Sequence, residues 1–208
     1  MAIKLVIFDC DGALVDSEPI SNKGLSASLN EIGILFTEEQ SSREFVGLNW
    51  VDTIAKIEAL SGKRLPQNFR DDVTTRRLAA LKGSVREMPG ASGAIEKILR
   101  YGYKVCVASS SEMPRVRLNL EETVLSRYFA NNVFSATQVT RGKPNPDLFL
   151  FSAKQMGIIP EECAVIEDNS NGFDAGVAAG MRVFAYVPIG FVTLAKVITF
   201  KNFSDLPE

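Results

Sequence analysis

Short apolar runs alternate with longer helical stretches along most of this sequence. The runs are rich in β-branched residues and end in polar or glycine positions, which is typical of strands buried on both faces of a parallel sheet. The predicted strands are residues 3–8, 103–108, 133–135, 164–166 and 182–187. Apolar residues at three- and four-residue intervals predict helices over residues 91–100, 112–126, 146–156 and 171–179. This alternation predicts an α/β fold with a doubly wound (Rossmann-like) parallel sheet.

One long segment breaks the alternation, because it has helical periodicity and no convincing strand. Thr37 has capping-box spacing to Gln40, and residues 50–60 and 67–81 carry apolar residues at helical intervals. The expected domains are an α/β core of residues 1–15 and 87–208 and an all-helical cap of residues 16–86. Ligands of open α/β sheets bind at the carboxyl edge of the strands, so we expect the inserted cap to cover the site.

Composition and charge exclude several classes of function. The chain has 208 residues, and its 23 Lys and Arg nearly balance its 25 Asp and Glu. Without a block of either sign, we expect no nucleic-acid partner and no membrane partner. There is no histidine, which excludes Ser-His-Asp triads, His-zinc hydrolysis and any histidine acid or base. The longest apolar stretch, 183–195, is interrupted by Pro188 and Gly190 and is too short to span a bilayer.

The cysteines and the start of the chain bear on cellular location. Cys10, Cys106 and Cys163 form an odd set without metal-ligand spacing, and none has an arginine six positions downstream to complete a phosphate-binding cysteine loop. Each lies in or beside a predicted buried strand, so we interpret them as core residues. The first strand begins almost at Met1, without the pattern of a secretory signal. These features favour a cytoplasmic protein, with a monomer as the default assembly.

Three carboxylates, Asp9, Asp11 and Asp16, lie within eight residues directly after the first predicted strand. Two carboxylates one residue apart are costly to hold together unless a cation compensates them, and Mg²⁺ prefers oxygen ligands. Gly12 fits the sharp turn that this arrangement needs. Aspartates are also common as caps and in solvated turns at strand–helix junctions. These residues alone therefore leave a metal site and a solvated turn equally open.

Further polar residues follow other predicted strands. Glu167 and Asp168 end one strand, Ser109 ends another, and Lys143 stands immediately before a proline that begins a helix. The carboxyl ends of parallel strands meet at one edge, so two acidic clusters can converge on one ion while a hydroxyl and a cation complete an anion site. A single serine there is more often a helix cap, and a single lysine more often a solvated charge. Their joint placement is what indicates a site.

In order and spacing, these residues resemble the haloacid dehalogenase-like superfamily of aspartate-nucleophile phosphotransferases over nearly the whole chain. The matching motifs are Asp9-x-Asp11-Gly-x-Leu-x-Asp16-Ser-Glu, Ser109 after a hydrophobic strand, Lys143 in Gly-Lys-Pro-x-Pro, and Glu167-Asp168 followed by Gly172, Ala175, Ala179 and Gly180. The helical insert looks like the family's first cap type, as in phosphoglycolate phosphatase, β-phosphoglucomutase and small sugar-phosphate phosphatases. The resemblance implies a Mg²⁺-dependent phosphohydrolase that cleaves a small phosphorylated metabolite, such as a sugar or sugar-acid phosphate.

The resemblance also implies a role for each motif residue. Asp9 would attack phosphorus to form an aspartyl-phosphate, and Asp11 would protonate the leaving oxygen and later deprotonate water. The dehalogenases lack this second aspartate, so its presence favours phosphate esters over carbon–halogen bonds. Mg²⁺ would be held by Asp9, Asp168 and the backbone carbonyl of Asp11. Glu167 would be a further ligand or would contact the ligands. The transferred phosphoryl group would be bound by Lys143, Ser109 and Ser110 with neighbouring backbone N–H groups.

The cap is expected to set substrate choice, because the four motifs account only for the phosphate. Residues 43–50 look like the family's cap specificity loop. Asn49 could hydrogen-bond a hydroxyl and Trp50 could form the wall of a sugar-sized pocket, although a tryptophan packed in the cap core is at least as common. Arg76 and Arg77 are the next candidates if the substrate is anionic.

Two positions depart from the family pattern and keep alternatives open. Many relatives have Thr where this chain has Ala13, which leaves a catalytically weakened phosphate-ligand binding protein as one alternative. Relatives of β-phosphoglucomutase carry a cap histidine where this chain has Ser21, so hydrolysis is favoured over the alternative, phosphosugar mutase chemistry. A signalling receiver domain also joins a doubly wound sheet to Mg²⁺, carboxylates, a hydroxyl and a lysine. Its phosphoacceptor belongs to a middle strand, however, and it has no helical insert.

Overall fold

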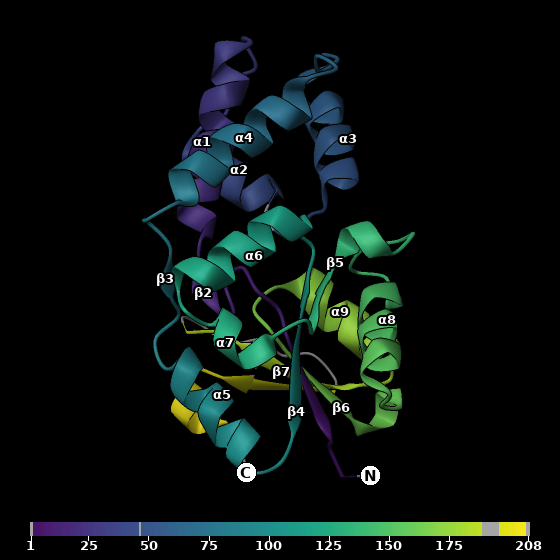
Figure 1. Cartoon of the computed structure of the whole chain (residues 1–208). Coiled ribbons are helices and arrows are strands. Elements are labelled where there is room, and N and C mark those ends of the chain that lie inside the picture. The colour runs from purple at the N-terminus through teal and green to yellow at the C-terminus, as the bar shows by residue number, and fades with distance from the viewer. Residues whose placement is uncertain (1, 46, 189–195, 207–208) are drawn as a thin grey trace.

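The computed structural model describes residues 2–45, 47–188 and 196–206, with a group of helices above a parallel sheet (Figure 1). Within this described part of the chain, the sheet has six strands in the order β5-β4-β1-β6-β7-β8, and every neighbouring pair is parallel. The strands are β1 (Leu5–Phe8), β4 (Lys104–Ser109), β5 (Val133–Ser135), β6 (Cys163–Glu167), β7 (Arg182–Tyr186) and β8 (Val197–Phe200). The predicted α/β fold with a parallel sheet is confirmed.

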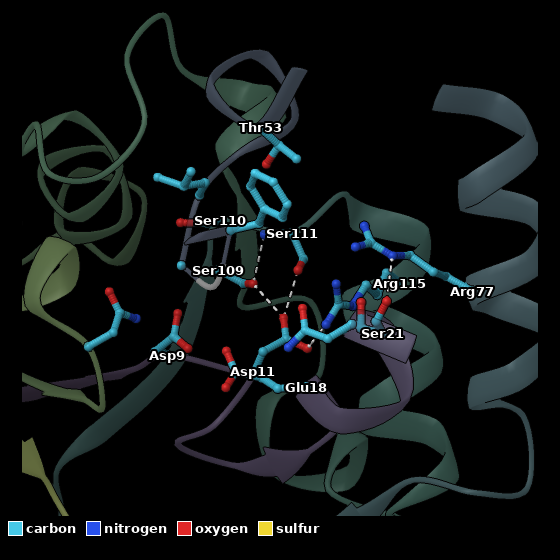
Figure 2. A pocket seen from close by; sticks show the side chains of 15 residues that line it. Asp9, Asp11, Glu18, Ser21, Thr53, Arg77, Ser109, Ser110, Ser111 and Arg115 are labelled. Atoms are coloured by element: carbon cyan, nitrogen blue, oxygen red, sulfur yellow. Dashed lines mark hydrogen bonds and ion pairs between the residues drawn. The ribbon is translucent and has the colours of Figure 1, made fainter. Parts of the chain in front are cut away.

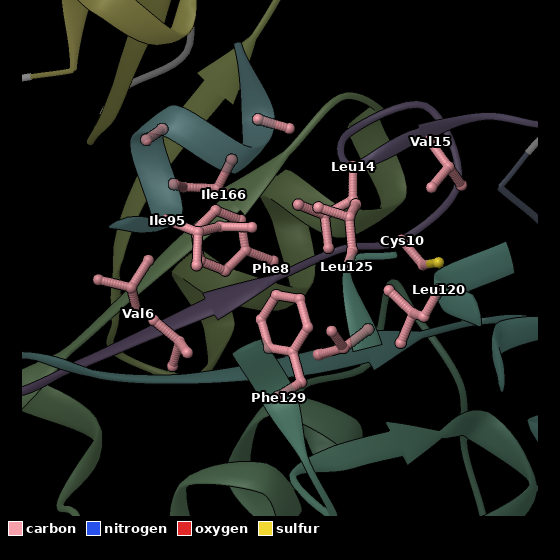
Figure 3. Packing of buried hydrophobic residues seen from close by; sticks show 14 of the residues in the cluster. Val6, Phe8, Cys10, Leu14, Val15, Ile95, Leu120, Leu125, Phe129 and Ile166 are labelled. Carbon is pink, nitrogen blue, oxygen red and sulfur yellow. The ribbon is translucent and has the colours of Figure 1, made fainter. Parts of the chain in front are cut away.

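Helices cover both faces of the sheet, because successive residues of each strand point to opposite sides. Val6 and Phe8 pack toward one face, where Phe8 meets Phe129 edge to face with ring centroids 6.0 Å apart (Figure 3). Leu5 and Ile7 pack toward the other. The first face is covered by α5 (Ala91–Arg100), α6 (Met113–Glu122) and α7 (Ser126–Phe129), and the second by α8 (Asp147–Met156) and α9 (Ser170–Ala178). The sheet is thus doubly wound, as predicted.

Besides a short two-stranded ribbon between core and cap, two elements differ from the sequence prediction. The single helix predicted over residues 112–126 is wrong in extent, because α6 ends at Glu122 and Val124 has a positive φ of 60° that a helix cannot accommodate. Strand β8 was not predicted. Only Phe200 of its four residues is buried and Ile198 is 46% exposed, so it lacks the continuous apolar character of a central strand.

The helical group consists of α1 (Glu18–Glu31), α2 (Glu38–Phe45), α3 (Trp50–Ser61) and α4 (Phe69–Leu81). It has an apolar cluster of its own, which includes Leu25, Leu29 and Val73. The predicted capping box is present, since Thr37 N donates to Gln40 Oε1 over 2.9 Å and Gln40 N donates to Thr37 Oγ1 over 3.0 Å. These four helices form the cap over the sheet.

A short antiparallel ribbon joins the two parts. It pairs β2 (Val15–Asp16) with β3 (Arg86–Glu87), and the domain boundaries predicted from the sequence fall within it. The division into a separately moving core and cap stays a prediction. In addition, α4 of the cap lies against α6 of the core, where Arg70 forms a salt bridge with Glu112.

The cysteines lie in the protein core, as the sequence predicts. Cys10, Cys106 and Cys163 are buried and unbridged, and all three belong to the apolar clusters on the sheet. Among the described helices, none is both long and apolar enough to cross a bilayer.

Candidate active site

Strand order brings the motif residues together from distant parts of the sequence. Strand β1 lies between β4 and β6, with Phe8 paired to Val107 on one side and to Ile166 on the other. The backbone N–H of Asp9 continues this ladder by donating to the Ile166 carbonyl over 2.9 Å. The next residues of all three strands therefore meet at the carboxyl edge of the sheet, beneath the cap.

Lys143 reaches this edge from the loop between β5 and α8, and it is almost fully buried. Its Nζ donates to Asp9 Oδ1 over 2.6 Å, to Glu167 Oε1 over 2.6 Å and to the Ala108 carbonyl over 2.9 Å. All three ammonium protons thus have acceptors. Burial opposes the charge, but the two carboxylates more than offset it and raise the pKa of Lys143. The lysine is therefore a fixed cation that orients Asp9.

Glu167 is fully buried and both of its oxygens are occupied. While Oε1 accepts from Lys143, Oε2 accepts from the backbone N–H groups of Asp168 and Asn169 over 2.9 and 3.2 Å. The first turn of α9 closes over it, since a Cβ on Gly172 would lie 1.9 Å from Glu167 Oε1. This glycine of the fourth motif thus makes room for the carboxylate. Through these hydrogen bonds Glu167 fixes the positions of the Lys143 side chain and of the Asp168 backbone.

Asp9, Glu167 and Asp168 place carboxylate oxygens within 4.8 Å of one another. Burial and the neighbouring carboxylates raise the pKa of Asp168 well above its ordinary value, and the pKa of Asp9 rises although Lys143 opposes it. Lys143 forms salt bridges with Asp9 and Glu167, so the third carboxylate of the group is left without a cation. A hard cation with oxygen ligands fits this donor set. The turn after β1 keeps the space open, because Gly12 has φ of 87° and a Cβ there would lie 2.1 Å from Asp168 Oδ2.

Asp11 faces away from Lys143 and toward α6. Its Oδ1 accepts from Arg115 over 2.7 Å and from Asn119 over 2.9 Å, and its Oδ2 accepts from Ser111 Oγ over 2.7 Å. The hydroxyl of Ser17 also donates to it. Although burial would raise it, the pKa of Asp11 is held below its ordinary value by Arg115 and by these hydroxyls. In this conformation Asp11 is an ionised carboxylate and hence a proton acceptor.

The serines at the end of β4 complete the wall of a pocket that Figure 2 shows from close by. The Oγ of Ser109 is buried, accepts from Ser111 N over 3.0 Å and lies 3.4 Å from Asp11 Oδ2. Ser110 is half-buried and lines the same pocket, as does Asp9. The space is about 540 Å³, including solvent at its mouth, and it runs from the core residues to the cap.

Comparison with known proteins agrees with this geometry. The family model described as haloacid dehalogenase-like hydrolase matches residues 6–186. The chain belongs to this hydrolase family. It is 30% identical to 6-phosphogluconate phosphatase of Escherichia coli over 99% of this chain and 94% of that protein, and 29% identical to a phosphorylated carbohydrates phosphatase of Thermotoga maritima over 89% and 86%.

A solved member of the haloacid dehalogenase-like family has the same fold. A hydrolase from Deinococcus radiodurans, solved with bound phosphate and sodium, is 31% identical to this chain. The match covers 96% of this chain and 92% of that one, with a TM-score of 0.71. The resemblance inferred from the four motifs is therefore confirmed, together with the fold that it implied.

In the present chain, the two cap residues that the sequence predicts to contact substrate have local partners. Asn49 caps α3, where Oδ1 accepts from Asp52 N over 3.1 Å and Nδ2 donates to Asp52 Oδ2 over 2.7 Å. It lines a hollow beside Gly142, next to the pocket that Asp9 lines. Trp50 borders both this hollow and a space that includes Arg77. Contact of Asn49 and Trp50 with substrate stays a prediction.

Sequence reasoning assigned no role to several residues that the structure brings to the site. Glu18 and Ser111 line the pocket, Ser17 donates to Asp11, and two further donors to Asp11 are Arg115 and Asn119. The last two are four residues apart on α6 and so share one helix face, and Asn119 is fully buried. A buried polar residue one turn after an arginine, on the helix that follows the serine strand, is the signal that could have identified them. Burial and Asp11 raise the pKa of Glu18 to about 7.

Proposed function

We propose that this chain is a Mg²⁺-dependent phosphatase that hydrolyses a small phosphorylated carbohydrate, a sugar or sugar-acid phosphate, through an aspartyl-phosphate. The observation that carries the proposal is the buried contact of Asp9 with Lys143 at the floor of a pocket roofed by the cap. The names of its relatives, a 6-phosphogluconate phosphatase and a phosphorylated carbohydrates phosphatase, support the substrate class.

Asp9 is the proposed nucleophile. Lys143 holds its Oδ1, whereas its Oδ2 accepts no side-chain or backbone hydrogen bond from the described residues. One oxygen is therefore fixed and the other is available to attack phosphorus. Covalent catalysis by a carboxylate divides the reaction into two displacements, because the acyl phosphate is itself readily hydrolysed. No histidine is needed for either step.

Asp11 is the proposed general acid and base. It lies two residues after the nucleophile and lines the same pocket, so its carboxyl group is near the bond to be cleaved. In the first displacement the protonated form of Asp11 would donate its proton to the leaving oxygen, and the ionised form of this structure is the one that remains after that transfer. It would then take a proton from the attacking water. Arg115 and Asn119 would position it for the second step, in which the ionised form is required.

Mg²⁺ would be held by Asp9, Asp168 and the backbone carbonyl of Asp11. Glu167 would support this site by holding Lys143 and the N–H of Asp168, since both its oxygens already accept hydrogen bonds. When bound, the ion would neutralise charge on Asp9 and on the phosphate and fix their relative orientation. Ser109, Ser110 and nearby backbone N–H groups would bind the equatorial oxygens, and Lys143 would offset their charge.

Ser21 favours hydrolysis over mutase chemistry. Its side chain is buried at the wall of the pocket, and its Oγ has no hydrogen-bond partner in the described part of the chain. A neutral hydroxyl there cannot act near neutral pH as the acid or base that a histidine supplies. Water is then the acceptor of the phosphoryl group. A cytoplasmic location and a monomeric state stay predictions.

Phosphate release from p-nitrophenyl phosphate, and then from a panel of phosphorylated sugars and sugar acids, tests the proposal. Activity is expected with Mg²⁺ and should be lost in Asp9→Asn by a factor on the order of 10⁴, because the variant keeps the shape but not the charge of the nucleophile. Asp174→Asn, an exposed position on α9, is the matched control. Wild-type protein inactive on every ester, or an active Asp9→Asn variant, would overturn the proposal.

A further inference from the structure

Arg77 is a cation on the cap side of the pocket, and other cap helices fix its side chain. Its stem crosses α1 at Gly24, where a Cβ would lie 3.4 Å from Arg77 Cγ. Its Nε donates to the Ser21 carbonyl over 3.1 Å, and its Cζ lies 5.1 Å from the centroid of the Trp50 ring. The guanidinium therefore has a defined position in the pocket wall.

The positive charge of Arg77 has no directly bonded counter-charge among the described residues, although the nearby carboxylates of Asp11 and Glu112 offset part of it. Across residues 2–45, 47–188 and 196–206 it forms no salt bridge, and its two Nη groups have no hydrogen-bond partner. Burial and the neighbouring charge of Arg115 lower the pKa of Arg77 to about 9. Arg115 is itself bonded to Asp11. A half-buried cation beside another cation is costly unless a ligand supplies the missing anion.

The preceding residue, Arg76, shows what a compensated arginine on the same helix looks like. It is exposed, and its Nη1 lies 2.6 Å from both carboxylate oxygens of Glu31. The sequence alone names both arginines as candidates for an anionic substrate. The rotation of α4 directs Arg77 to the pocket and Arg76 to the outer surface.

The pocket connects Arg77 with the proposed nucleophile. Both residues line it, and Figure 2 shows Asp9 and Arg77 on opposite sides, with Ser109 and Asp11 between them. A phosphate bound at Asp9 would consequently direct the rest of the substrate toward Arg77. The group that meets Arg77 belongs to the leaving part of the molecule.

We propose that Arg77 binds a second anionic group, a carboxylate or a phosphate, on the leaving part of the substrate. This inference rests on the proposed phosphatase function and specifies its substrate class as sugar-acid phosphates or sugar bisphosphates. A guanidinium donates two parallel hydrogen bonds to the oxygens of such a group, which a hydroxyl cannot accept. Neutral sugar monophosphates leave the charge unpaired and are poorer substrates.

The test compares gluconate 6-phosphate, glucitol 6-phosphate and glucitol 1,6-bisphosphate. They share one carbon chain and differ only at C1, which carries a carboxylate, a hydroxyl or a second phosphate. Wild-type kcat/KM is expected to be about tenfold or more higher for one of the two C1 anions than for glucitol 6-phosphate. The better of the two identifies the anion as carboxylate or phosphate. Equal values for all three overturn the proposal.

The ratio of kcat/KM for the preferred C1 anion to kcat/KM for glucitol 6-phosphate should fall to within about twofold of unity in Arg77→Gln. This variant keeps a polar side chain but removes the charge. Arg76→Gln is the matched control and should leave the ratio and the overall activity unchanged. A ratio that survives in Arg77→Gln, or falls equally in both variants, contradicts the inference. Should Arg77→Gln not fold, Arg77→Lys keeps the charge without the planar fork and must lower the ratio by about threefold.

The phosphatase function and the Arg77 subsite fail in different ways. If wild-type protein with Mg²⁺ hydrolyses no ester, including p-nitrophenyl phosphate, the phosphatase function is wrong. Calorimetric binding of gluconate 6-phosphate, glucitol 1,6-bisphosphate and glucitol 6-phosphate then tests the subsite separately. A preference for a C1 anion that Arg77→Gln removes supports it, and the absence of any preference overturns it.

Discussion

Lys143 and Arg77 are both cations near the pocket, but their surroundings differ. Lys143 is almost fully buried and donates to two carboxylates and a carbonyl. Arg77 is half-buried and donates only to one carbonyl among the described groups. A charge compensated by the protein holds the reacting atoms in one geometry, whereas an uncompensated one is available to a ligand. In the proposed function, the core would thus carry out the chemistry and the cap would select the substrate.

Of the changes considered, removal of the metal should have the largest effect on activity. EDTA is expected to abolish turnover of every ester, because the charge of Asp9 and Asp168 would no longer be neutralised. Asp168→Asn should raise the Mg²⁺ concentration for half-maximal activity by about tenfold or more. Titration of p-nitrophenyl phosphate hydrolysis with Mg²⁺ measures both, with Asp174→Asn as control. Normal turnover in EDTA would remove the metal from the account.

Lys143→Met should destabilise the core and stop catalysis together. The substitution leaves Asp9 and Glu167 buried without their cation, a change that costs about 3–5 kcal/mol. Urea unfolding measures the loss, and Lys154→Met at an exposed position of α8 is the control. A free energy of unfolding within about 1 kcal/mol of wild type would mean that these carboxylates do not depend on Lys143.

Gly172→Ala should lower activity by roughly tenfold because it displaces the side chain of Glu167. A Cβ 1.9 Å from Glu167 Oε1 forces this carboxylate, and with it Lys143, to move. Gly93→Ala on α5 is the matched control, since a Cβ there meets nothing within 4 Å and should stabilise the protein by up to about 1 kcal/mol. Wild-type kcat in Gly172→Ala would show that the position of Glu167 is not critical.

Of these substitutions, Asn49→Ala should have the smallest effect on activity. Asn49 belongs to the cap, and its side chain caps α3. Loss of the cap is expected to cost about 1 kcal/mol of stability, measured by thermal unfolding. The ranking of sugar phosphates should change by no more than about threefold. A reordering of substrates by tenfold would show that Asn49 contacts substrate directly, as the sequence predicted.

The core motifs could be predicted because their convergence depends only on topology. The carboxyl ends of adjacent parallel strands meet wherever the intervening chain runs, so Asp9, Ser109 and Glu167 are brought together by strand order alone. Lys143 comes from a loop, so its position before a helix-starting proline made it a candidate and the resemblance to the family supplied its role. The contacts that occupy Glu167 depend on how closely α9 approaches, and the sequence shows only that Gly172 permits it.

The cap side was harder to predict, because helix rotation decides it. Arg76 and Arg77 are adjacent in the sequence, and only the packing of α4 on α1 turns one to the pocket and the other to Glu31. The same holds for Arg115 and Asn119, whose face of α6 is set by its packing against the sheet. Periodicity identifies a helix but does not orient single polar residues on it.

The most direct test of the central claim locates the phosphoryl group during turnover. Asp11→Asn lacks the base that activates water, but p-nitrophenolate leaves without needing a proton, so the first displacement should proceed and the second should stall. The variant is mixed with p-nitrophenyl phosphate and Mg²⁺, quenched in acid and digested for mass spectrometry. The account predicts one phosphoryl group on the peptide that contains Asp9, absent when Asp9 is also changed to Asn. Turnover without any phosphorylated peptide, or with the group on another residue, would contradict it.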